Sequence, residues 1–233
     1  DWKAHGLVDL RRAIAVSSDV YFYEVGGGYK DQKGIGIYNI EKYTKMFGFG
    51  TTTDIDFPGE RAGTIPNPEW KKANFKGEDW RLGDTYNTSI GQYGFQVTPI
   101  QVVSALGALA NGGNVLTPHF VVGEQSNLRG KVDLDPSYFQ IVKEGMRLGV
   151  TDGTSHAINF PFVKVASKTG TAQIGVNKDE VNSWVVGYWP LDKPKYAYVV
   201  VMERGSKNNQ FGAVLVMQEF LDWLHVYDPA YLE

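Results

Sequence analysis

The stretch "VASKTGTAQ" at residues 165–173 places a lysine, two threonines and a glycine in one short segment. Its residues alternate as in a strand, with Lys168 and Gly170 on one face and Thr169 and Thr171 on the other. A glycine inside a strand often marks a place where a ligand or another backbone comes close. A lysine two residues before such a gap can bring an ammonium group to that ligand. Taken alone, the stretch also suits an exposed edge strand with a solvated lysine.

A second polar group, "SSD" at residues 17–19, interrupts a segment whose apolar spacing suits a helix. Ser18 or Asp19 can cap a second helix starting at Val20, because their side-chain oxygens accept hydrogen bonds from free backbone N–H groups. Ser17 therefore has two interpretations. Its hydroxyl either caps a helix or takes part in chemistry beside a lysine.

Other common kinds of catalytic centre are not indicated. The histidines are scattered, with no H-E-x-x-H motif, so neither a metal nor another cofactor is expected. They are His5, His119, His156 and His225. The sequence has no G-x-S-x-G and no glycine-rich nucleotide-binding motif. Asp54 and Asp56 lie in a loop with proline and glycine, where carboxylates more often form turns or are solvated than take part in catalysis.

Composition narrows the class of protein. Of the 233 residues, 42% are apolar and 21% charged, which is typical of a folded globular chain. The formal net charge of −3 gives no basic surface for nucleic acid, so nucleic acid is not expected as a partner. No apolar run approaches the length of a membrane-spanning helix, and no signal peptide opens the chain. We expect either a cytosolic protein or a piece cut from something larger.

The order of the expected elements predicts an α/β protein of the α+β type, with an antiparallel sheet flanked by helices. Helical patterns come first, followed by three strand-like runs and a closing helix. The strands are expected at 163–174, 182–189 and 195–203, with a turn at "DKPK", and the closing helix at 211–224. The run 195–203 is apolar on both faces, so it is expected to be central or helix-covered. Residues 51–88 are polar and rich in turn residues and are expected to be irregular.

The clearest single helix begins at "TPIQ". Thr98 is the expected N-cap, Pro99 the first helical residue and Gln101 the second half of a capping box. The glycine pair at 112–113 is expected to end the helix. The expected buried stripe is Val102, Leu106 and Leu109.

These blocks resemble the transpeptidase domain of class B penicillin-binding proteins, nearest to the elongation-type enzymes. The motifs S-x-x-K, S-D-N and K-T-G together identify penicillin-binding proteins and serine β-lactamases. The similarity follows the family's order over nearly the whole chain. It is carried by "FGFGTTTDIDFPGERAGTIPNPEW", "SIGQYGFQVTPIQVVSALGALANGG" and "GTSHAINFPFVKVASKTGTAQ". It implies a single partial transpeptidase domain at 1–233, mainly helical to about residue 160, with the strands and last helix at about 161–227.

The resemblance also assigns roles. Ser17 and Asp19 match the family's Ser-x-Asn motif, with an aspartate in place of asparagine. The exchange replaces an amide donor with an anion, and its effect on hydrogen bonding to the substrate is left open by the sequence. Lys168 is implied to lend positive charge beside Ser17.

The other residues of the strand motif are implied to bind substrate. Thr169 and Thr171 hold its carboxylate, and the N–H of Thr171 forms half of an oxyanion hole. The lack of a side chain at Gly170 leaves room for an acyl donor along the strand.

The family's nucleophile is missing from this sequence. No serine is followed by lysine three residues later, and only 16 residues precede Ser17. In the family, that motif lies well upstream of the Ser-x-Asn serine. We therefore expect the chain to be the C-terminal part of a transpeptidase domain, inactive alone, whose upstream segment carries the nucleophile.

For the parent protein, the resemblance implies a serine-type peptidoglycan D,D-transpeptidase that cross-links stem peptides and is acylated by β-lactam antibiotics. It implies a membrane-anchored enzyme on the periplasmic or extracytoplasmic face, with a membrane glycosyltransferase as a further partner. Two alternatives remain at this point. One is a serine β-lactamase or β-lactam sensor domain, and the other is a non-catalytic scaffold or binding module of the same fold.

Overall fold

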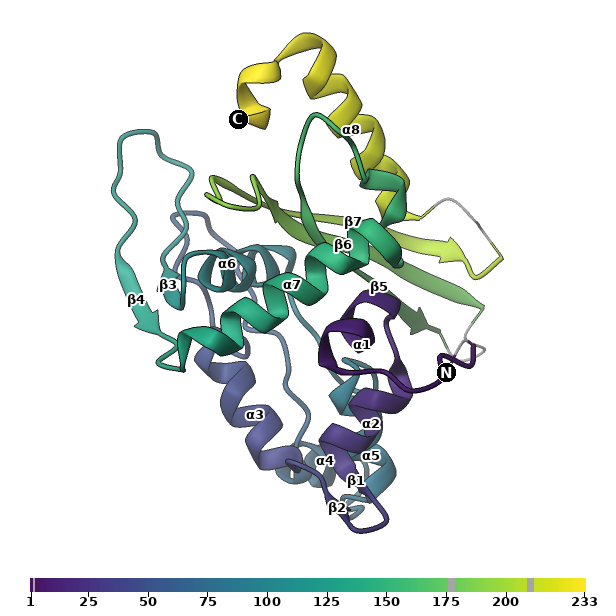
Figure 1. The fold of residues 1–233 in the computed structure, drawn as a ribbon. Coiled ribbons are helices and arrows are strands. Elements are labelled where there is room, and N and C mark those ends of the chain that lie inside the picture. The colour runs from purple at the N-terminus through teal and green to yellow at the C-terminus, as the bar shows by residue number, and fades with distance from the viewer. Residues whose placement is uncertain (2, 176–178, 209–211) are drawn as a thin grey trace. The chain divides into compact units, whose positions relative to one another are not determined.

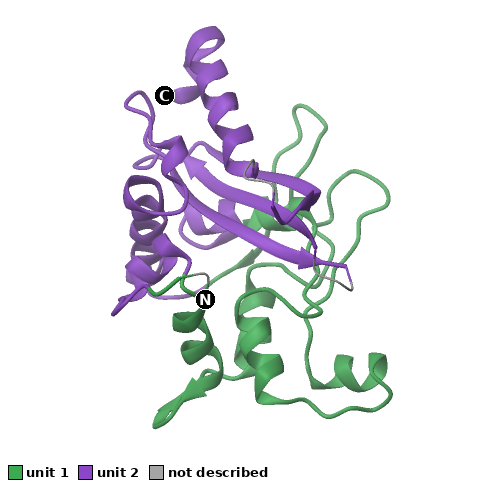
Figure 2. Ribbon diagram, turned by 90° about the vertical axis from the view of Figure 1, so that its right-hand side faces the viewer, with its two compact units in different colours: residues 1–4, 18–105, 115–132 green, residues 5–17, 106–114, 133–233 purple. Residues whose placement is uncertain are grey.

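A computed structural model describes residues 1, 3–175, 179–208 and 212–233, which form two compact units (Figure 2). Unit 1 comprises residues 1–4, 18–105 and 115–132, and unit 2 comprises residues 5–17, 106–114 and 133–233. The chain passes from unit 2 to unit 1 between Ser17 and Ser18, inside the polar group at 17–19.

Unit 2 contains an antiparallel sheet in the order β5-β6-β7. The strands are β5 (Ala166–Ile174), β6 (Glu180–Trp189) and β7 (Tyr196–Ser206). The turn after β6 forms where "DKPK" predicts it, and the Lys195 N–H donates to the Trp189 carbonyl at 3.1 Å. Among the described residues β7 pairs only with β6, so of the two expected alternatives, central or helix-covered, it is not the central one. Its expected cover by a helix is correct, since α8 (Ala213–Tyr227) packs against it.

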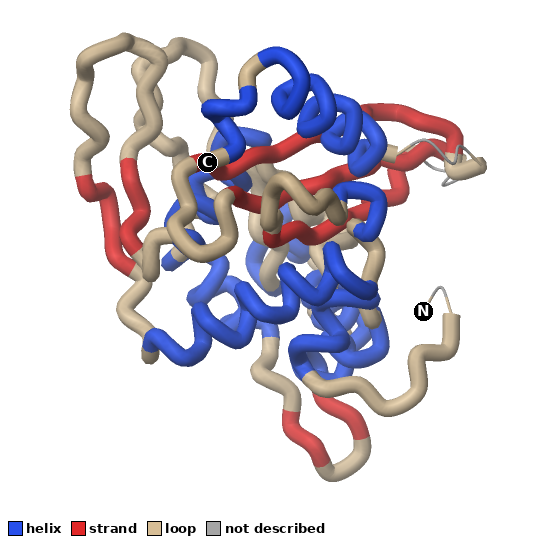
Figure 3. The backbone as a smooth tube through the Cα atoms, turned by 45° about the horizontal axis from the view of Figure 1, so that its top comes forward, coloured by secondary structure: helices blue, strands red, loops and turns tan. Residues whose placement is uncertain are grey.

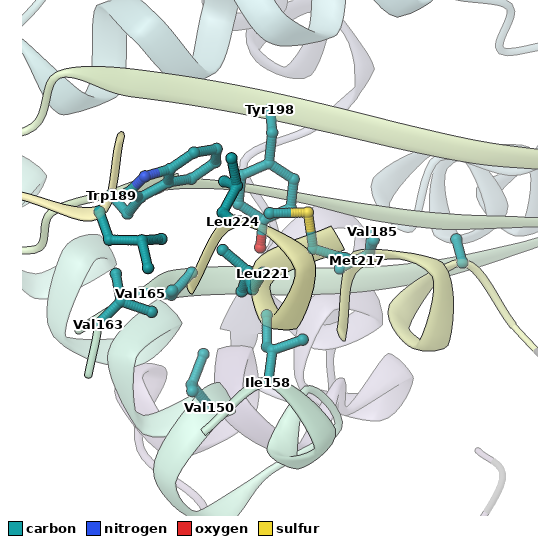
Figure 4. Packing of buried hydrophobic residues seen from close by; sticks show 12 residues of the cluster. Val150, Ile158, Val163, Val165, Val185, Trp189, Tyr198, Met217, Leu221 and Leu224 are labelled. Carbon is teal, nitrogen blue, oxygen red and sulfur yellow. The ribbon is translucent and has the colours of Figure 1, made fainter. Parts of the chain in front are cut away.

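The core of unit 2 lies between this sheet and α8 (Figure 4). Helix α8 turns one apolar stripe inward, and the short helices η1 (His156–Ile158) and η2 (Pro229–Leu232) pack against it. The inward residues of α8 are Ala213, Met217, Leu221 and Leu224. The expected start of this helix at Phe211 lies outside the described residues. Burial of the stripe against Val185 and Tyr198 joins the closing helix to the sheet.

Two further helices of unit 2 pack in succession against the sheet (Figure 1). Helix α1 (Leu10–Val16) packs on α7 (Pro136–Asp152), which also packs on β5. Asp9 caps α1 and Asp135 caps α7, each by accepting a hydrogen bond from a backbone N–H of the first turn.

Unit 1 is mainly helical with long loops (Figure 3). Its helices are α2 (Asp19–Gly27), α3 (Ile37–Met46), α4 (Pro68–Asn74), α5 (Leu82–Ser89) and the first part of α6 (Pro99–Ala110). Small strand pairs are formed by β1 (Gly28–Tyr29) with β2 (Gln32–Lys33) and by β3 (Asn114–Leu116) with β4 (Leu128–Lys131).

Two expectations for this region need correction. The segment 51–88 is not wholly irregular, because it contains α4 and part of α5. The buried residues of α6 include Gln101, Ala105, Ala108 and Leu109, whereas Val102 and Leu106 are only partly buried. Gln101 explains the different face, since its side-chain amide donates to the carbonyls of Thr51 and Ala62 at 2.7 and 2.8 Å. The capping box is confirmed, with both Thr98–Gln101 hydrogen bonds present.

Candidate active site

The structure brings the lysine of the strand motif and the serine of the "SSD" group together inside unit 2. The Lys168 ammonium lies 2.7 Å from the Ser17 hydroxyl oxygen, although 151 residues separate them in sequence. The same ammonium donates to the Thr169 carbonyl at 2.5 Å. An ammonium held this close to a hydroxyl favours the alkoxide and offers a path for a proton.

Backbone geometry leaves the Ser17 side chain available for this contact. Ser17 is the C-cap of α1, with φ 56° and ψ 55°, and its N–H donates to the carbonyls of Ala13 and Ile14. The capping side chain belongs instead to Ser18, which accepts from the Tyr21 N–H at 3.4 Å and begins α2. A left-handed conformation is uncommon for a residue other than glycine, and such residues cluster at functional sites.

The register of β5 places Lys168 and Gly170 on the face that Ser17 approaches. Lys168 lies opposite Val186, and Gly170 lies opposite Trp184. A Cβ atom added at Gly170 would meet only the Trp184 Cβ, at 3.5 Å. Apart from the two chain neighbours, no other atom of the described residues lies within 4 Å of that Cβ position, and the role of Gly170 in admitting a substrate stays a prediction.

Thr154 was not singled out in the sequence, yet it contacts the strand motif. Its hydroxyl accepts a hydrogen bond from the Thr169 hydroxyl at 2.7 Å, and its N–H donates to the Ala15 carbonyl at 3.1 Å. Thr154 thus joins the end of α1 to β5. The loop "TDGTS" after a long helix is the sequence signal that points to it.

Glycines on one side of α7 allow α1 and β5 to approach it closely. A Cβ at Gly149 would lie 3.0 Å from the Ser167 carbonyl oxygen, and one at Gly153 would lie 2.2 Å from the Ala15 carbonyl oxygen. Because these neighbours are backbone atoms, no side-chain movement could relieve the overlap. The close approach of α1 and β5 to this side of α7 brings Ser17 and Lys168 together.

Charged side chains of α1 and α7 hold the two helices together. Arg11 pairs with Glu144 at 2.5 Å, and Arg12 pairs with Asp152 at 2.5 Å. The hydrogen bond from Arg11 holds the pKa of the Glu144 carboxyl below its usual value.

Arg147 of α7 contacts the segment that leads into β5. Its guanidinium donates to the Val165 carbonyl at 3.0 Å, just before the strand begins. Burial lowers the pKa of this guanidinium, which remains charged at neutral pH.

The other residues predicted for the site are Thr169, Thr171 and Asp19. Thr169 and Thr171 are on the face of β5 opposite to Lys168, and Thr171 is exposed. Asp19 is the first residue of α2 and belongs to unit 1, so its participation in the site stays a prediction.

Neither a metal site nor a membrane span is found within the described ranges. No group of three or more His, Cys, Asp or Glu side chains there could hold a metal ion. None of the helices in those ranges is both long and apolar enough to span a bilayer.

Comparison with known proteins gives a consistent family. Residues 1–219 match the penicillin-binding protein transpeptidase domain. The peptidoglycan D,D-transpeptidase MrdA of Acinetobacter baumannii is 34% identical, over 96% of this chain and 36% of that protein. MrdA of Escherichia coli K12 is 30% identical, over 98% of this chain and 39% of that protein. The chain thus spans less than two fifths of the length of these curated relatives.

Solved structures agree with the sequence matches. Penicillin-binding protein PBP2 from Helicobacter pylori superposes with a TM-score of 0.82 at 33% identity, over 98% of this chain and 42% of that chain. PBP2 of Pseudomonas aeruginosa, in complex with WCK 5153, gives a TM-score of 0.77 at 30% identity, over 94% of this chain and 50% of that chain. The chain belongs to the penicillin-binding protein transpeptidase family, among its elongation-type class B members.

Proposed function

We propose that the protein containing this chain is a serine D,D-transpeptidase that cross-links peptidoglycan stem peptides. The observation that carries the proposal is the 2.7 Å contact between the Lys168 ammonium and the Ser17 hydroxyl, beside a strand whose glycine leaves space for a substrate. Relatives named peptidoglycan D,D-transpeptidase support it.

The reaction has two half-steps. In the first, the oxygen of a serine outside this chain attacks the carbonyl carbon between the two D-alanines of a donor peptide. The peptide C–N bond breaks, and D-alanine leaves with the proton that the serine gives up. In the second, an acceptor amine attacks the acyl-serine ester. A new amide bond forms, the C–O bond breaks, and a proton from the amine returns to the serine.

This chain supplies the groups around the nucleophile. Ser17 passes the proton between the nucleophile and the leaving amine, and Lys168 stabilises the negative charge that builds up on those oxygens. The hydroxyls of Thr169 and Thr171 donate to the donor carboxylate. For this the Thr169 hydroxyl turns its hydrogen from Thr154 to the carboxylate and accepts a hydrogen bond from the Thr154 hydroxyl in return. The backbone N–H of Thr171 supplies half of the oxyanion hole, and Asp19 takes the place of the asparagine in the family's Ser-x-Asn motif.

The same serine is the site of β-lactam acylation, since a β-lactam presents a strained amide and a carboxylate to these groups. The chain is one part of a single transpeptidase domain, helical to about residue 160 and followed by the strands and last helix at about 161–227. The upstream part carries the Ser-x-x-Lys segment.

We place the parent on the extracytoplasmic side of the cytoplasmic membrane, held by an N-terminal anchor, where peptidoglycan is accessible. A membrane glycosyltransferase is the proposed partner. A related structure is described as coordinating polymerization and crosslinking in a peptidoglycan synthase complex, and the Helicobacter pylori relative forms a complex with MreC.

The test is a coupled assay on the complete protein with a D-Ala-D-Ala donor peptide and an amine acceptor. We expect D-alanine release together with a new donor–acceptor amide detected by mass spectrometry. Rapid turnover of nitrocefin without amide formation would indicate a β-lactamase instead. Absence of both activities in an otherwise folded protein would favour a binding module.

A further inference from the structure

Unit 1 contains a cavity of about 390 Å³ that the proposed reaction does not use. It lies where α2, β1 and α5 meet, and its volume is near the lower end of the range for small-ligand pockets. Its lining residues are Val20, Tyr23, Glu24, Gly28, Tyr29 and Tyr86. Half of these residues are tyrosines, and one is acidic.

Two of the tyrosine rings pack against each other, and one of them is anchored by a hydrogen bond. The Tyr23 and Tyr86 ring centroids lie 5.9 Å apart, with the ring planes at 49°. The Tyr86 hydroxyl donates to the Gly28 carbonyl at 2.7 Å. Its ring occupies the space that a side chain at Gly27 would need, since a Cβ there would lie 2.2 Å from the ring. The Tyr86 hydroxyl already donates to Gly28. The part of Tyr86 that can contact a ligand in the cavity is therefore its ring.

The charge of the cavity wall is negative. Glu24 is partly buried, and within the described ranges no cation or hydrogen-bond donor pairs with its carboxylate. Burial raises the pKa of Tyr23, and the charge of Asp19, one turn earlier on α2, adds to this shift. A carboxylate removed from water is stabilised when a cation reaches it.

A neighbouring contact shows that one of these rings already accepts an ammonium group. The Lys30 ammonium lies 5.2 Å from the centroid of the Tyr29 ring. Lys30 is not one of the residues lining the cavity. The negative ring faces of tyrosine attract cations in this way, and sites for alkylammonium groups are commonly built from several such rings.

We propose that this cavity binds the alkylammonium side chain of a short peptide. The ammonium group lies against the tyrosine rings and pairs with Glu24, while Val20 and the Gly28 backbone contact the methylene groups. Val20 is 47% exposed and Tyr29 56% exposed, so a ligand can enter from solvent. The lining of this cavity includes neither Ser17 nor Lys168, and the proposal does not depend on the proposed reaction.

The proposal is tested with the complete protein and two probes that differ in one group. Nα-acetyl-lysine methylamide carries the ammonium, and Nα-acetyl-norleucine methylamide has a neutral side chain. Saturation-transfer NMR titrations give the affinity of each. We expect the lysine probe to bind with millimolar affinity and the norleucine probe at least tenfold more weakly.

Two variants and a control assign the binding to this cavity. Glu24→Gln removes the charge at nearly constant volume and should weaken the lysine probe about tenfold or more. Tyr29→Leu removes an exposed ring and should weaken it several-fold. Glu219→Gln makes the same charge change on an exposed position of α8 and should leave binding unchanged.

Equal binding of the two probes would overturn the proposal, and so would unchanged affinity in both cavity variants. Thermal melting and acylation by a fluorescent penicillin are measured on every variant. Tyr29→Leu serves alone if Glu24→Gln fails to fold. Because acylation depends on the Ser17–Lys168 site, a failure of lysine binding leaves the proposed function standing, and a failure of acylation leaves this proposal standing.

Discussion

At the scale of single residues, the conformation of Ser17 matters as much as its chemistry. A serine whose side chain capped the next helix would be engaged with backbone N–H groups. That task falls to Ser18, and the left-handed backbone of Ser17 ends α1 while its hydroxyl meets Lys168. Two adjacent serines thus divide a structural role and a chemical one.

Loss of the lysine should slow acylation far more than it affects folding. Lys168→Ala removes a charge-assisted contact that is strongest as negative charge develops, worth on the order of 2–4 kcal/mol. In the complete protein, we expect acylation by a fluorescent penicillin to slow about a hundredfold or more, with little change in melting temperature. Lys164→Ala, at an exposed position just before β5, is the control. A wild-type acylation rate in Lys168→Ala would refute the assignment.

Thr154 should act by orienting Thr169. Thr154→Val keeps the shape of the side chain but removes the hydroxyl that lies 2.7 Å from the Thr169 hydroxyl and that donates to it once Thr169 binds the substrate carboxylate. One hydrogen bond of this kind is worth about 1 kcal/mol, so acylation should slow roughly fivefold. Thr154→Ser keeps the hydroxyl and should restore most of the rate. If the valine and serine variants acylate equally fast, the hydroxyl has no such role.

At the scale of elements, α7 determines how close α1 comes to β5. Gly149 of α7 and Gly153 directly after it lie against backbone atoms of α1 and β5. Exposed ion pairs with Arg11 and Arg12 also link α7 to α1. The site therefore depends on a helix that contributes no catalytic group of its own.

A methyl group on this side of α7 should disturb the site. Gly149→Ala places a Cβ 3.0 Å from the Ser167 carbonyl oxygen, one residue before Lys168. We expect a lower melting temperature and slower acylation together. Gly107→Ala is the matched control, because a Cβ there meets nothing within 4 Å on helix α6. It should be neutral or stabilise by about 0.4–1 kcal/mol. Equal behaviour of the two variants would contradict this role of α7.

The sequence alone predicts elements best where pattern and caps agree. The strands, the turn at "DKPK" and the capping box at Thr98 follow from local signals and are present. Helices α4 and α5 were missed because they are short and polar, and their caps lie at Asn67 and Arg81 within a turn-rich stretch. The buried face of α6 was misplaced because Gln101 pairs with loop carbonyls that are distant in sequence.

The residues of the candidate site also differ in how well the sequence alone predicts them. Gly170 stands out in the sequence because a glycine weakens the interior of a strand, whereas Lys168 alone also suits an exposed edge strand. The position of Ser17 beside Lys168 came from resemblance, since no local signal relates residues 151 positions apart. Thr154 was missed because its role rests on one tertiary contact.

At the scale of the whole molecule, unit 2 presents apolar and polar surface that has no partner within the described chain. Strand β7 has one edge without a neighbouring strand among the described residues. Helix α8 carries a second, outward stripe of apolar residues one turn apart. Its exposed members are Val216, Phe220, Trp223 and Tyr227. Exposed strand edges and large apolar patches are known sites of association.

We therefore expect residues 1–233 expressed alone to aggregate or to unfold without cooperativity. An upstream segment supplied as a second chain should restore a soluble complex by covering β7 and the outer stripe of α8. Size-exclusion chromatography and thermal unfolding with and without that segment give the answer. A soluble monomer of 1–233 with a sharp two-state transition would show that the surface needs no cover.

The central claim is that Ser17 and Lys168 assist a nucleophile that lies outside this chain. The most direct measurement is to acylate the complete protein with a penicillin, digest it and locate the adduct by mass spectrometry. The account predicts one adduct, on a serine upstream of residue 1 that is followed by lysine three residues later, and none within residues 1–233. A stoichiometric adduct on Ser17, or on any other serine of this chain, would contradict it.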